Sequence, residues 1–417
     1  MRQWMVAAKK ADFYAIAEKF HVDPVVARII RNREVIGEKN IRIYLGGNLS
    51  DLSDPHQMKD MDRLVEILAQ KIRKQVRIRI IGDYDVDGVT SSHLFLMALR
   101  RVGAKVDVVI PHRIQDGYGL SLHLLQQAKE DGVDTILTCD NGIAAIDEIA
   151  WAKAQKMTVL VTDHHAVPFE EHEGRRTEKK SLADAVVNPH QQDCGYPYKE
   201  LCGAGVAWNV IRVLYENYDM DKREAEDLLD FVAMATVCDV MSLTGENRIL
   251  VKEGLKRIRH TKNIGLQALM QACNVQPENI SAYHFGYVLG PCVNATGRLD
   301  TARHALRLFE TGQETEAEEI ARDLVDLNQE RKELTLQGVE MAKKLCEEGG
   351  YENDPILVLF LPDVHESIAG LIAGRIREMY NRPVFVLTRG EEGVKGSGRS
   401  TENYSMYENM CGCAEHI

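Results

Sequence analysis

The chain has 417 residues, a length that predicts two or three domains, each large enough to bury its own hydrophobic core. Its 45% apolar and 27% charged residues are typical of a globular protein, and no apolar run approaches the ~20 residues that a membrane helix needs. The net charge of -12 argues against a protein that coats nucleic acid non-specifically, but it allows an enzyme with a local basic groove. The amino terminus is charged too early for a secretory signal, so we expect a cytoplasmic protein that does not associate with membranes.

The first 75 residues are predicted to form a helical segment that packs on the core. Apolar residues recur at three- and four-residue spacing over 11–31 and over 58–74, which predicts one helix in each stretch. Asp54-Pro55 is a helix-start signal ahead of the second stretch.

From residue 76 onward, apolar strands alternate with helices. The predicted strands are 76–81, 105–111, 135–139, 158–162 and 183–187, and the predicted helices between them are 91–102, 121–131 and 144–155. This alternation predicts an α/β fold with a parallel, doubly wound sheet. We assign 76–313 to this domain, with 203–290 mostly helical.

A long charged helix is predicted over 314–348, and we expect it to be a solvated connector between two domains. Gly349-Gly350 ends it. A strand over 355–361, a helix over 367–380 and a strand over 383–387 then predict a smaller α/β domain within 349–417.

The most informative motif is Asp83-Tyr84-Asp85-Val86-Asp87-Gly88, directly after the first predicted strand. On an extended chain the three carboxylates would point to one side, and their mutual repulsion would favour a bound cation. An EF-hand loop begins in the same way, but it needs a glutamate at its twelfth position, where Leu94 stands, and a helix rather than a strand before it. For this cluster alone, a solvated acidic turn is the plainer alternative.

Further polar residues fall at the ends of other predicted strands, namely Asp140, Asp163-His164-His165 and Asn188. Because the carboxyl ends of parallel strands share one rim, we expect these side chains to converge. Carboxylate and imidazole donors suit manganese, magnesium or iron-like ions, and the chain has no Cys-x-x-Cys pair for a zinc ribbon. Enough carboxylates are present for two ions, which favours hydrolysis of a phosphate ester.

Three other segments offer groups for binding phosphate. They are Pro111-His112-Arg113 with Gly117-Tyr118-Gly119, the predicted turn Asn294-Ala295-Thr296-Gly297-Arg298, and the permissive stretch Gly396-Ser397-Gly398-Arg399-Ser400. Each alone is more often a surface turn, so their weight comes from recurring beside a phosphoesterase-like site.

Together these motifs resemble the DHH phosphoesterase superfamily, named for the motif that stands here as Asp163-His164-His165, and within it the RecJ-like single-strand-specific exonucleases. The resemblance rests on the motifs already described and on Asp140-Asn141-Gly142-Ile143, Leu201-Cys202-Gly203-Ala204-Gly205 and Ala235-Thr236-Val237-Cys238-Asp239. It implies a DHH domain joined by the long helix to a smaller, incomplete DHHA1-like domain.

The resemblance also implies roles for individual residues and partners. The metal ligands would be Asp83, Asp85, Asp140, His164 and Asp239, holding two Mn²⁺ or Mg²⁺ ions per active site. His165, Asp163 and Asp87 would serve catalysis, and substrate would be bound by Arg113, Tyr118, Arg298, Ser397, Arg399 and His365. The implied activity is 5′ to 3′ hydrolysis of single-stranded DNA to mononucleotides in repair and recombination, by a monomer that works with a helicase and a single-strand-binding protein.

The chain departs from the family pattern in two places. Cys292 follows Pro291 where an arginine is usual, and the sequence stops at Ile417, before the Gly-Gly-His motif and the OB-fold domain that the family carries. We therefore expect a C-terminally shortened member. Two alternatives stay open: a hydrolase of short oligonucleotides or small phosphoesters, and a metal-binding form with little activity.

Overall fold

The computed structural model describes residues 9–114, 116–172, 175–390 and 393–413. Its centre is a five-stranded sheet in the order β2-β1-β3-β4-β7, in which every neighbouring pair is parallel. The strands are β1 (Arg77–Ile81), β2 (Lys105–Val109), β3 (Thr135–Cys139), β4 (Thr158–Thr162) and β7 (Ala185–Val187). The predicted parallel α/β fold is confirmed.

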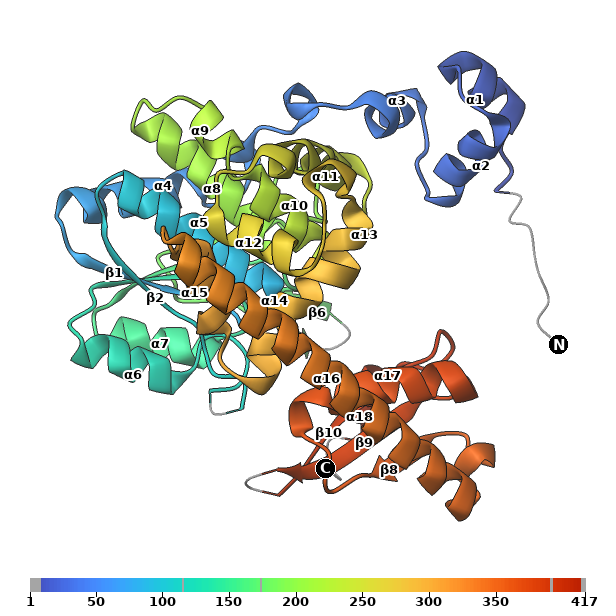
Figure 1. The fold of residues 1–417 in the computed structure, drawn as a ribbon. Helices are drawn as coiled ribbons and strands as arrows, with labels where there is room; N and C mark the ends of the chain where they lie inside the picture. The colour runs from blue at the N-terminus through green and yellow to red at the C-terminus, as the bar shows by residue number, and fades with distance from the viewer. Residues whose placement is uncertain (1–8, 115, 173–174, 391–392, 414–417) are drawn as a thin grey trace.

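Helices cover both faces of this sheet (Figure 1). α6 (Leu122–Glu130) and α7 (Ile146–Ala154) pack on one face, whereas α4 (Met61–Arg73), α5 (Val86–Arg101) and α8 (Gly203–Asn217) pack on the other. The strands β3, β4 and β7 are buried almost throughout, which explains their largely apolar sequences, whereas the edge strand β2 is only partly buried.

The N-terminal helices differ from the prediction. The stretch 11–31 is two helices, α1 (Phe13–Phe20) and α2 (Pro24–Asn32), because His21 takes a left-handed conformation with φ of 52° and Asp23 caps the second helix. Asp54 begins only the short 3₁₀ helix η2 (Pro55–Gln57), and α4 starts at Met61.

This N-terminal segment contacts the core unevenly. α4 lies in the main core, while α1, α2 and α3 (Glu38–Gly46) share a small apolar cluster of their own and stand to one side in Figure 1. Arg248 of α11 (Gly245–Arg257) joins them to the core, since its guanidinium lies 3.8 Å from the Tyr44 ring centroid.

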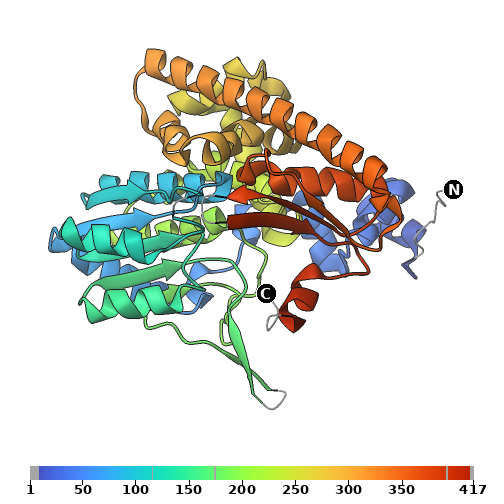
Figure 2. The same cartoon turned by 90° about the horizontal axis from the view of Figure 1, so that it is seen from below.

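The predicted helical layer follows the sheet. Its remaining members are α9 (Arg223–Glu226), α10 (Leu229–Cys238), α12 (Ile264–Ala272), α13 (Ala282–His284), the π-helix η5 (Phe285–Leu289), α14 (Gly290–Leu299) and α15 (Ala302–Glu310). The sequence did not predict the antiparallel hairpin of β5 (Phe169–His172) and β6 (Arg175–Glu178), which projects from the domain in Figure 2.

The long helix α16 (Glu314–Gly349) matches its prediction to within one residue, but it is more than a solvated connector. Its first half buries Ala317, Ala321 and Leu324 in the main core, and its second half buries Val339 and Ala342 in the core of the C-terminal unit. One helix is therefore part of two cores.

The C-terminal unit contains a three-stranded sheet in the order β10-β9-β8. Its elements are β8 (Leu357–Phe360), the 3₁₀ helix η7 (Glu366–Ile368), α17 (Ala369–Tyr380), β9 (Val384–Gly390), β10 (Gly393–Arg399) and α18 (Met406–Gly412). The stretch predicted as a permissive phosphate-binding turn at 396–400 is instead mostly strand β10, paired antiparallel with β9. Within the described ranges, every helix is too short or too polar to span a bilayer.

Candidate active site

The polar residues of the predicted rim gather where the strand order reverses, between β1 and β3. Asp83 lies just beyond β1, Asp140 follows β3 directly, and His164 lies just beyond β4. Asp239 approaches from the C-terminal end of α10. The point of reversal in a doubly wound sheet is where such folds bind ligands.

The Asp83–Gly88 segment reaches this arrangement by a route that the sequence did not predict. α5 begins at Val86 rather than at 91, with Asp85 as its N-cap, whose carboxylate accepts the Gly88 N–H at 3.0 Å. The carboxylates therefore converge because the chain turns from strand into helix, and the extended-chain argument is wrong. A Cβ on Gly88 would lie 2.4 Å from the Asp83 carbonyl oxygen, so only glycine fits this turn.

Three overlapping groups of side chains in the described structure could each hold a cation, with their ligand atoms within 4.8 Å of one another. The groups are Asp83, Asp85 and Asp140; Asp87, His164 and Asp239; and Asp140, His164 and His165. All five predicted ligands are thus brought together, joined by Asp87 and His165. Asp140 and His164 each belong to two groups, which suits two adjacent ions.

The chemistry of this cluster fits divalent cations. Both carboxylate oxygens of Asp83, one of Asp140 and the Nε2 atom of His164 are buried without a hydrogen-bond partner. Burial, reinforced by neighbouring carboxylates, raises the pKa of Asp83 and of Asp239 to about 8 and that of Asp140 well above its usual value. Such a group ionises together only beside positive charge, and its oxygen and imidazole donors match Mn²⁺ or Mg²⁺.

Two residues predicted to be catalytic also hold the site together. Asp87 accepts the N–H groups of Gly203 and Ala204 at 2.6 and 2.7 Å, which ties the start of α5 to the start of α8. Asp163 lies outside the three groups, and its carboxylate accepts the backbone N–H of His164 at 2.7 Å and the Nδ1 proton of His165 at 2.8 Å. Asp163 therefore orients the two histidines.

His165 lies beside the cluster, held there by Asp163. Burial alone would lower its pKa, but the hydrogen bond and negative charge of Asp163 outweigh this and raise the pKa of His165 to about 8. The Tyr118 hydroxyl donates to the Asp140 carbonyl oxygen at 3.0 Å and lies 3.1 Å from Nε2 of His165. The predicted substrate residue Tyr118 is thus placed beside the cluster.

Two arginines of the first unit, Arg113 and Arg298, lie near this cluster. The Arg113 guanidinium lies 4.6 Å from the Tyr84 ring centroid, and Arg298 donates to the Ser367 carbonyl oxygen of the C-terminal unit at 2.7 Å. Burial lowers the pKa of Arg298 to about 10, and the positive charges of Arg113 and Arg331 add to this effect. The motif around Arg298 is helix α14, not the predicted turn.

Arg331 was missed by the sequence analysis. It lies on α16, where many charged residues alternate, so no local signal distinguished it. The Arg331 guanidinium donates two N–H groups to Asn328 Oδ1, at 2.9 and 3.2 Å, and these hydrogen bonds fix the orientation of its side chain.

The remaining predicted substrate residues lie in the C-terminal unit. On β10, Arg399 donates to the Gly398 carbonyl oxygen at 2.8 Å and contacts Ser397 Oγ at 3.3 Å. Burial lowers the pKa of Arg399, as do the charges of Arg377 and Arg113, so Arg399 and Arg113 approach each other across the two units. His365 is exposed and caps η7 through Ser367, the residue whose carbonyl oxygen accepts from Arg298.

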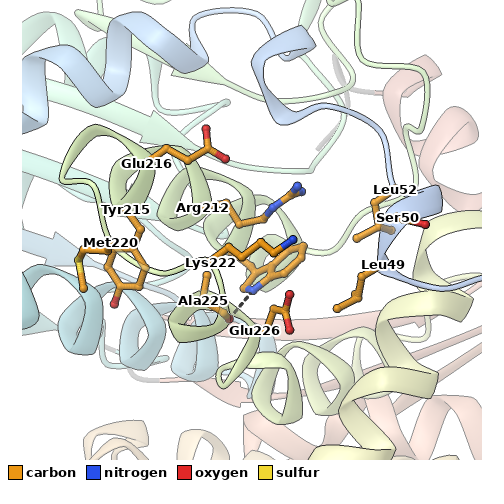
Figure 3. A pocket seen from close by; sticks show the side chains of 11 residues that line it. Leu49, Ser50, Leu52, Arg212, Tyr215, Glu216, Met220, Lys222, Ala225 and Glu226 are labelled. Atoms are coloured by element: carbon orange, nitrogen blue, oxygen red, sulfur yellow. Dashed lines mark hydrogen bonds between the residues drawn. The ribbon is translucent and has the colours of Figure 1, made fainter.

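A separate cavity of about 180 Å³ lies away from these residues, where the segment 49–52 meets α8 and α9 (Figure 3). The Trp208 indole donates to the Ala225 carbonyl oxygen at its floor, at 2.7 Å. None of the carboxylates of the three groups lines it.

Comparison with known proteins identifies the family. The family model described as the DHH family, N-terminal domain, matches residues 77–236. The single-stranded-DNA-specific exonuclease RecJ of Haemophilus influenzae is 36% identical over 397 residues, which cover 92% of this chain and 67% of that protein. This chain belongs to the RecJ family.

Other RecJ proteins extend the likeness. The Escherichia coli RecJ is 34% identical and 67% covered, and the Bacillus subtilis RecJ is 33% identical and 49% covered, so the chain spans between half and two thirds of these relatives. A crystal structure of exonuclease RecJ bound to manganese superposes with a TM-score of 0.72 at 32% identity, covering 85% of each chain. RecJ of Thermus thermophilus in complex with Mn²⁺ gives a TM-score of 0.80 at 29% identity, covering 99% of this chain and 57% of that one.

Proposed function

We propose that this chain is a metal-dependent exonuclease that hydrolyses single-stranded DNA from the 5′ end and releases mononucleotides, in DNA repair and recombination. The observation that carries this proposal is the buried cluster of carboxylates and imidazoles that forms three overlapping possible cation sites, with Arg113 and Arg298 nearby. The relatives named single-stranded-DNA-specific exonucleases support the substrate class.

Two Mn²⁺ or Mg²⁺ ions would be held by Asp83, Asp85, Asp140, His164 and Asp239, with Asp87 completing the set. Bound divalent cations lower the pKa of water and offset the charge of a phosphate ester. The chain's own residues then position the substrate. His165, fixed by Asp163, presents an imidazole beside the cluster.

The arginines account for binding of the DNA backbone. Besides burial, the charge of Arg113 lowers the pKa of Arg298 in the first unit and that of Arg399 in the second, so an anion between these arginines would relieve their repulsion. Ser397 would add a hydroxyl and Tyr118 an aromatic face for a terminal nucleotide. The helicase and single-strand-binding partners, the monomeric state and the cytoplasmic location stay predictions.

The test is release of nucleotides from 5′-phosphorylated single-stranded DNA with Mn²⁺. We expect Asp83→Asn and His164→Asn each to lower the rate by more than about 100-fold. Mutation of a residue that only hydrogen-bonds to a metal ligand already lowers activity roughly 10–100-fold. Asp221→Asn, which alters an exposed carboxylate paired with Arg223, is the matched control and should keep its rate. Undiminished release by either site variant would overturn the proposal.

The same assay separates the alternative substrates. A nuclease for long strands degrades a long strand faster than a dinucleotide, whereas a hydrolase of short oligonucleotides shows the reverse order. Calorimetric binding of Mn²⁺ without release from either substrate would favour a metal-binding form.

A further inference from the structure

Two cysteines outside the metal cluster lie in contact behind the arginines. Cys273 caps the C-terminal end of α12, Cys292 lies in the first turn of α14, and their sulfur atoms are 3.8 Å apart. Cys292 is buried, whereas Cys273 is partly exposed. The exposed side of Cys273 therefore gives a small oxidant a route to the pair, whose sulfurs are in van der Waals contact.

The surroundings favour the thiolate on Cys292. The contact with Cys273 lowers the pKa of Cys292 and raises that of Cys273, although burial opposes ionisation of Cys292. Asn328 Nδ2 lies 3.5 Å from the Cys292 sulfur, and the positive charges of Lys332 and Arg331 on α16 add to the effect. Low-pKa thiolates near cations with a second thiol in reach are the reactive kind.

We propose that Cys273 and Cys292 form a reversible oxidation site that takes a peroxide. The Cys292 sulfur attacks a peroxide oxygen, which forms an S–O bond, breaks the O–O bond and releases water. The Cys273 sulfur then attacks the Cys292 sulfur, which forms the disulfide and releases a second water. Two thiols are oxidised and hydrogen peroxide is reduced to two water molecules, and a dithiol reverses the step.

The disulfide would weaken binding of single-stranded DNA through Asn328, which contacts Cys292. A disulfide bond needs sulfurs about 2.05 Å apart, so the two sulfurs must move closer together, and a shift of the Cys292 sulfur would alter its contact with Asn328. The other side of the Asn328 amide accepts both N–H groups that hold Arg331, which lies near Arg298. Oxidation therefore loosens Arg331 and weakens binding of single-stranded DNA; this second part rests on the proposed function.

The experiment uses the full chain with Cys411→Ser and Cys413→Ser, which removes the two exposed thiols. Hydrogen peroxide is titrated in, and peptides are mapped by mass spectrometry before and after dithiothreitol. We expect a Cys273–Cys292 cross-link that forms first among the remaining cysteines and disappears on reduction. Peroxide that leaves this pair unlinked, or oxidises other cysteines first, overturns the oxidation site whatever the activity of the chain.

Binding of a phosphorothioate single strand, followed by fluorescence anisotropy, tests the second part without cleavage. Oxidation should weaken binding roughly tenfold, the effect of losing one charge-assisted contact, and dithiothreitol should restore it. Cys292→Ser removes the sulfur that attacks the peroxide and should bind equally with or without peroxide. A cross-linked chain with unchanged affinity overturns the link to Arg331, and absence of any DNA binding in the reduced chain counts against the proposed function instead.

Discussion

Asp163 and Asp230 are both buried carboxylates, yet their surroundings set their pKa values in opposite directions. Asp163 accepts hydrogen bonds from Ile143 and from both histidines of its motif, which hold its pKa below the usual value even though burial opposes this. Asp230 has only the Thr261 hydroxyl at 2.6 Å and the Phe231 N–H at 2.9 Å, and burial raises its pKa to about 6. Asp163 accepts more hydrogen bonds than Asp230, and one of its donors is His165, so its pKa is lowered while that of Asp230 is raised.

The raised pKa of Asp230 predicts a pH dependence of stability. Its protonated form favours the folded state, so this contribution is complete below pH ~4 and is lost as the pH rises through about 6. Asp230→Asn keeps a neutral side chain at every pH. We expect the variant to gain roughly 2–3 kcal/mol over the parent between pH 4.5 and 7.5, measured by urea unfolding at both pH values. An equal difference between the two proteins at both pH values would contradict the shift.

The sequence predicted that the acidic and histidine side chains gather at one rim, because this prediction needs only residue types and their positions at the ends of strands. Asp83, Asp140 and His164 follow strands that share a rim, so the topology brings them together whatever the loop conformations. Asp239 was assigned only through the family resemblance, since it ends a helix. Arg331 could not be found, because its role depends on where the second half of α16 lies relative to α14.

Among the elements, α14 shows how a helix can be mistaken for a turn. Asparagine and glycine in 294–297 are turn residues, but here they serve close packing. Asn294 Oδ1 accepts the Val86 N–H at 3.1 Å, and a Cβ on Gly297 would lie 2.3 Å from the Tyr84 carbonyl oxygen. α14 thus supports the start of α5, which carries the carboxylates.

Gly297→Ala should push α14 away from this turn. We expect a loss of about 1–3 kcal/mol in stability from overpacking, together with weaker Mn²⁺ binding, because Asp83 and Asp85 flank Tyr84. Gly312→Ala is the control, since a Cβ there meets nothing within 4 Å. Thermal unfolding and calorimetric Mn²⁺ titration measure both effects, and wild-type values for Gly297→Ala would refute the packing argument.

Buried apolar strands were predicted more accurately than exposed or polar ones. The strands over 135–139 and 158–162 were predicted to the residue because both are buried apolar runs. The strands β5, β6 and β10 were missed because charged residues or glycine and serine fill them, and their pairing arises from a neighbouring strand rather than from their own composition.

In the whole molecule, an acidic chain carries a local group of arginines because acidic and basic side chains lie in different places. Acidic side chains line the metal cluster and the outer face of α16, while arginines from β10, α14 and α16 meet between the two units. The net charge of -12 is a sum over the whole chain, so it does not exclude a polyanionic substrate bound at a local group of arginines.

Sharing of α16 predicts that the two cores unfold together. Ile372→Ala removes a fully buried side chain from the C-terminal core and should cost about 2–5 kcal/mol. Trp151 and Trp208 both lie in the first unit, so in a Trp4→Phe background their fluorescence reports its unfolding alone. We expect the fluorescence midpoint to fall in Ile372→Ala but not in Leu336→Ala, whose side chain is exposed on α16. An unchanged fluorescence midpoint in Ile372→Ala would show that the two units unfold independently.

The continuity of α16 also decides how this architecture can change in length. Surface loops absorb an extra residue at little cost, but each residue inserted between Leu324 and Val339 would advance the C-terminal unit by about 1.5 Å and turn it by roughly 100° about the helix axis. Arg399 and Ser367 would then swing away from Arg113 and Arg298. The placement of the two units therefore depends on the number of residues in α16, and insertions in this part of the helix are tolerated only where a full number of turns restores the facing side.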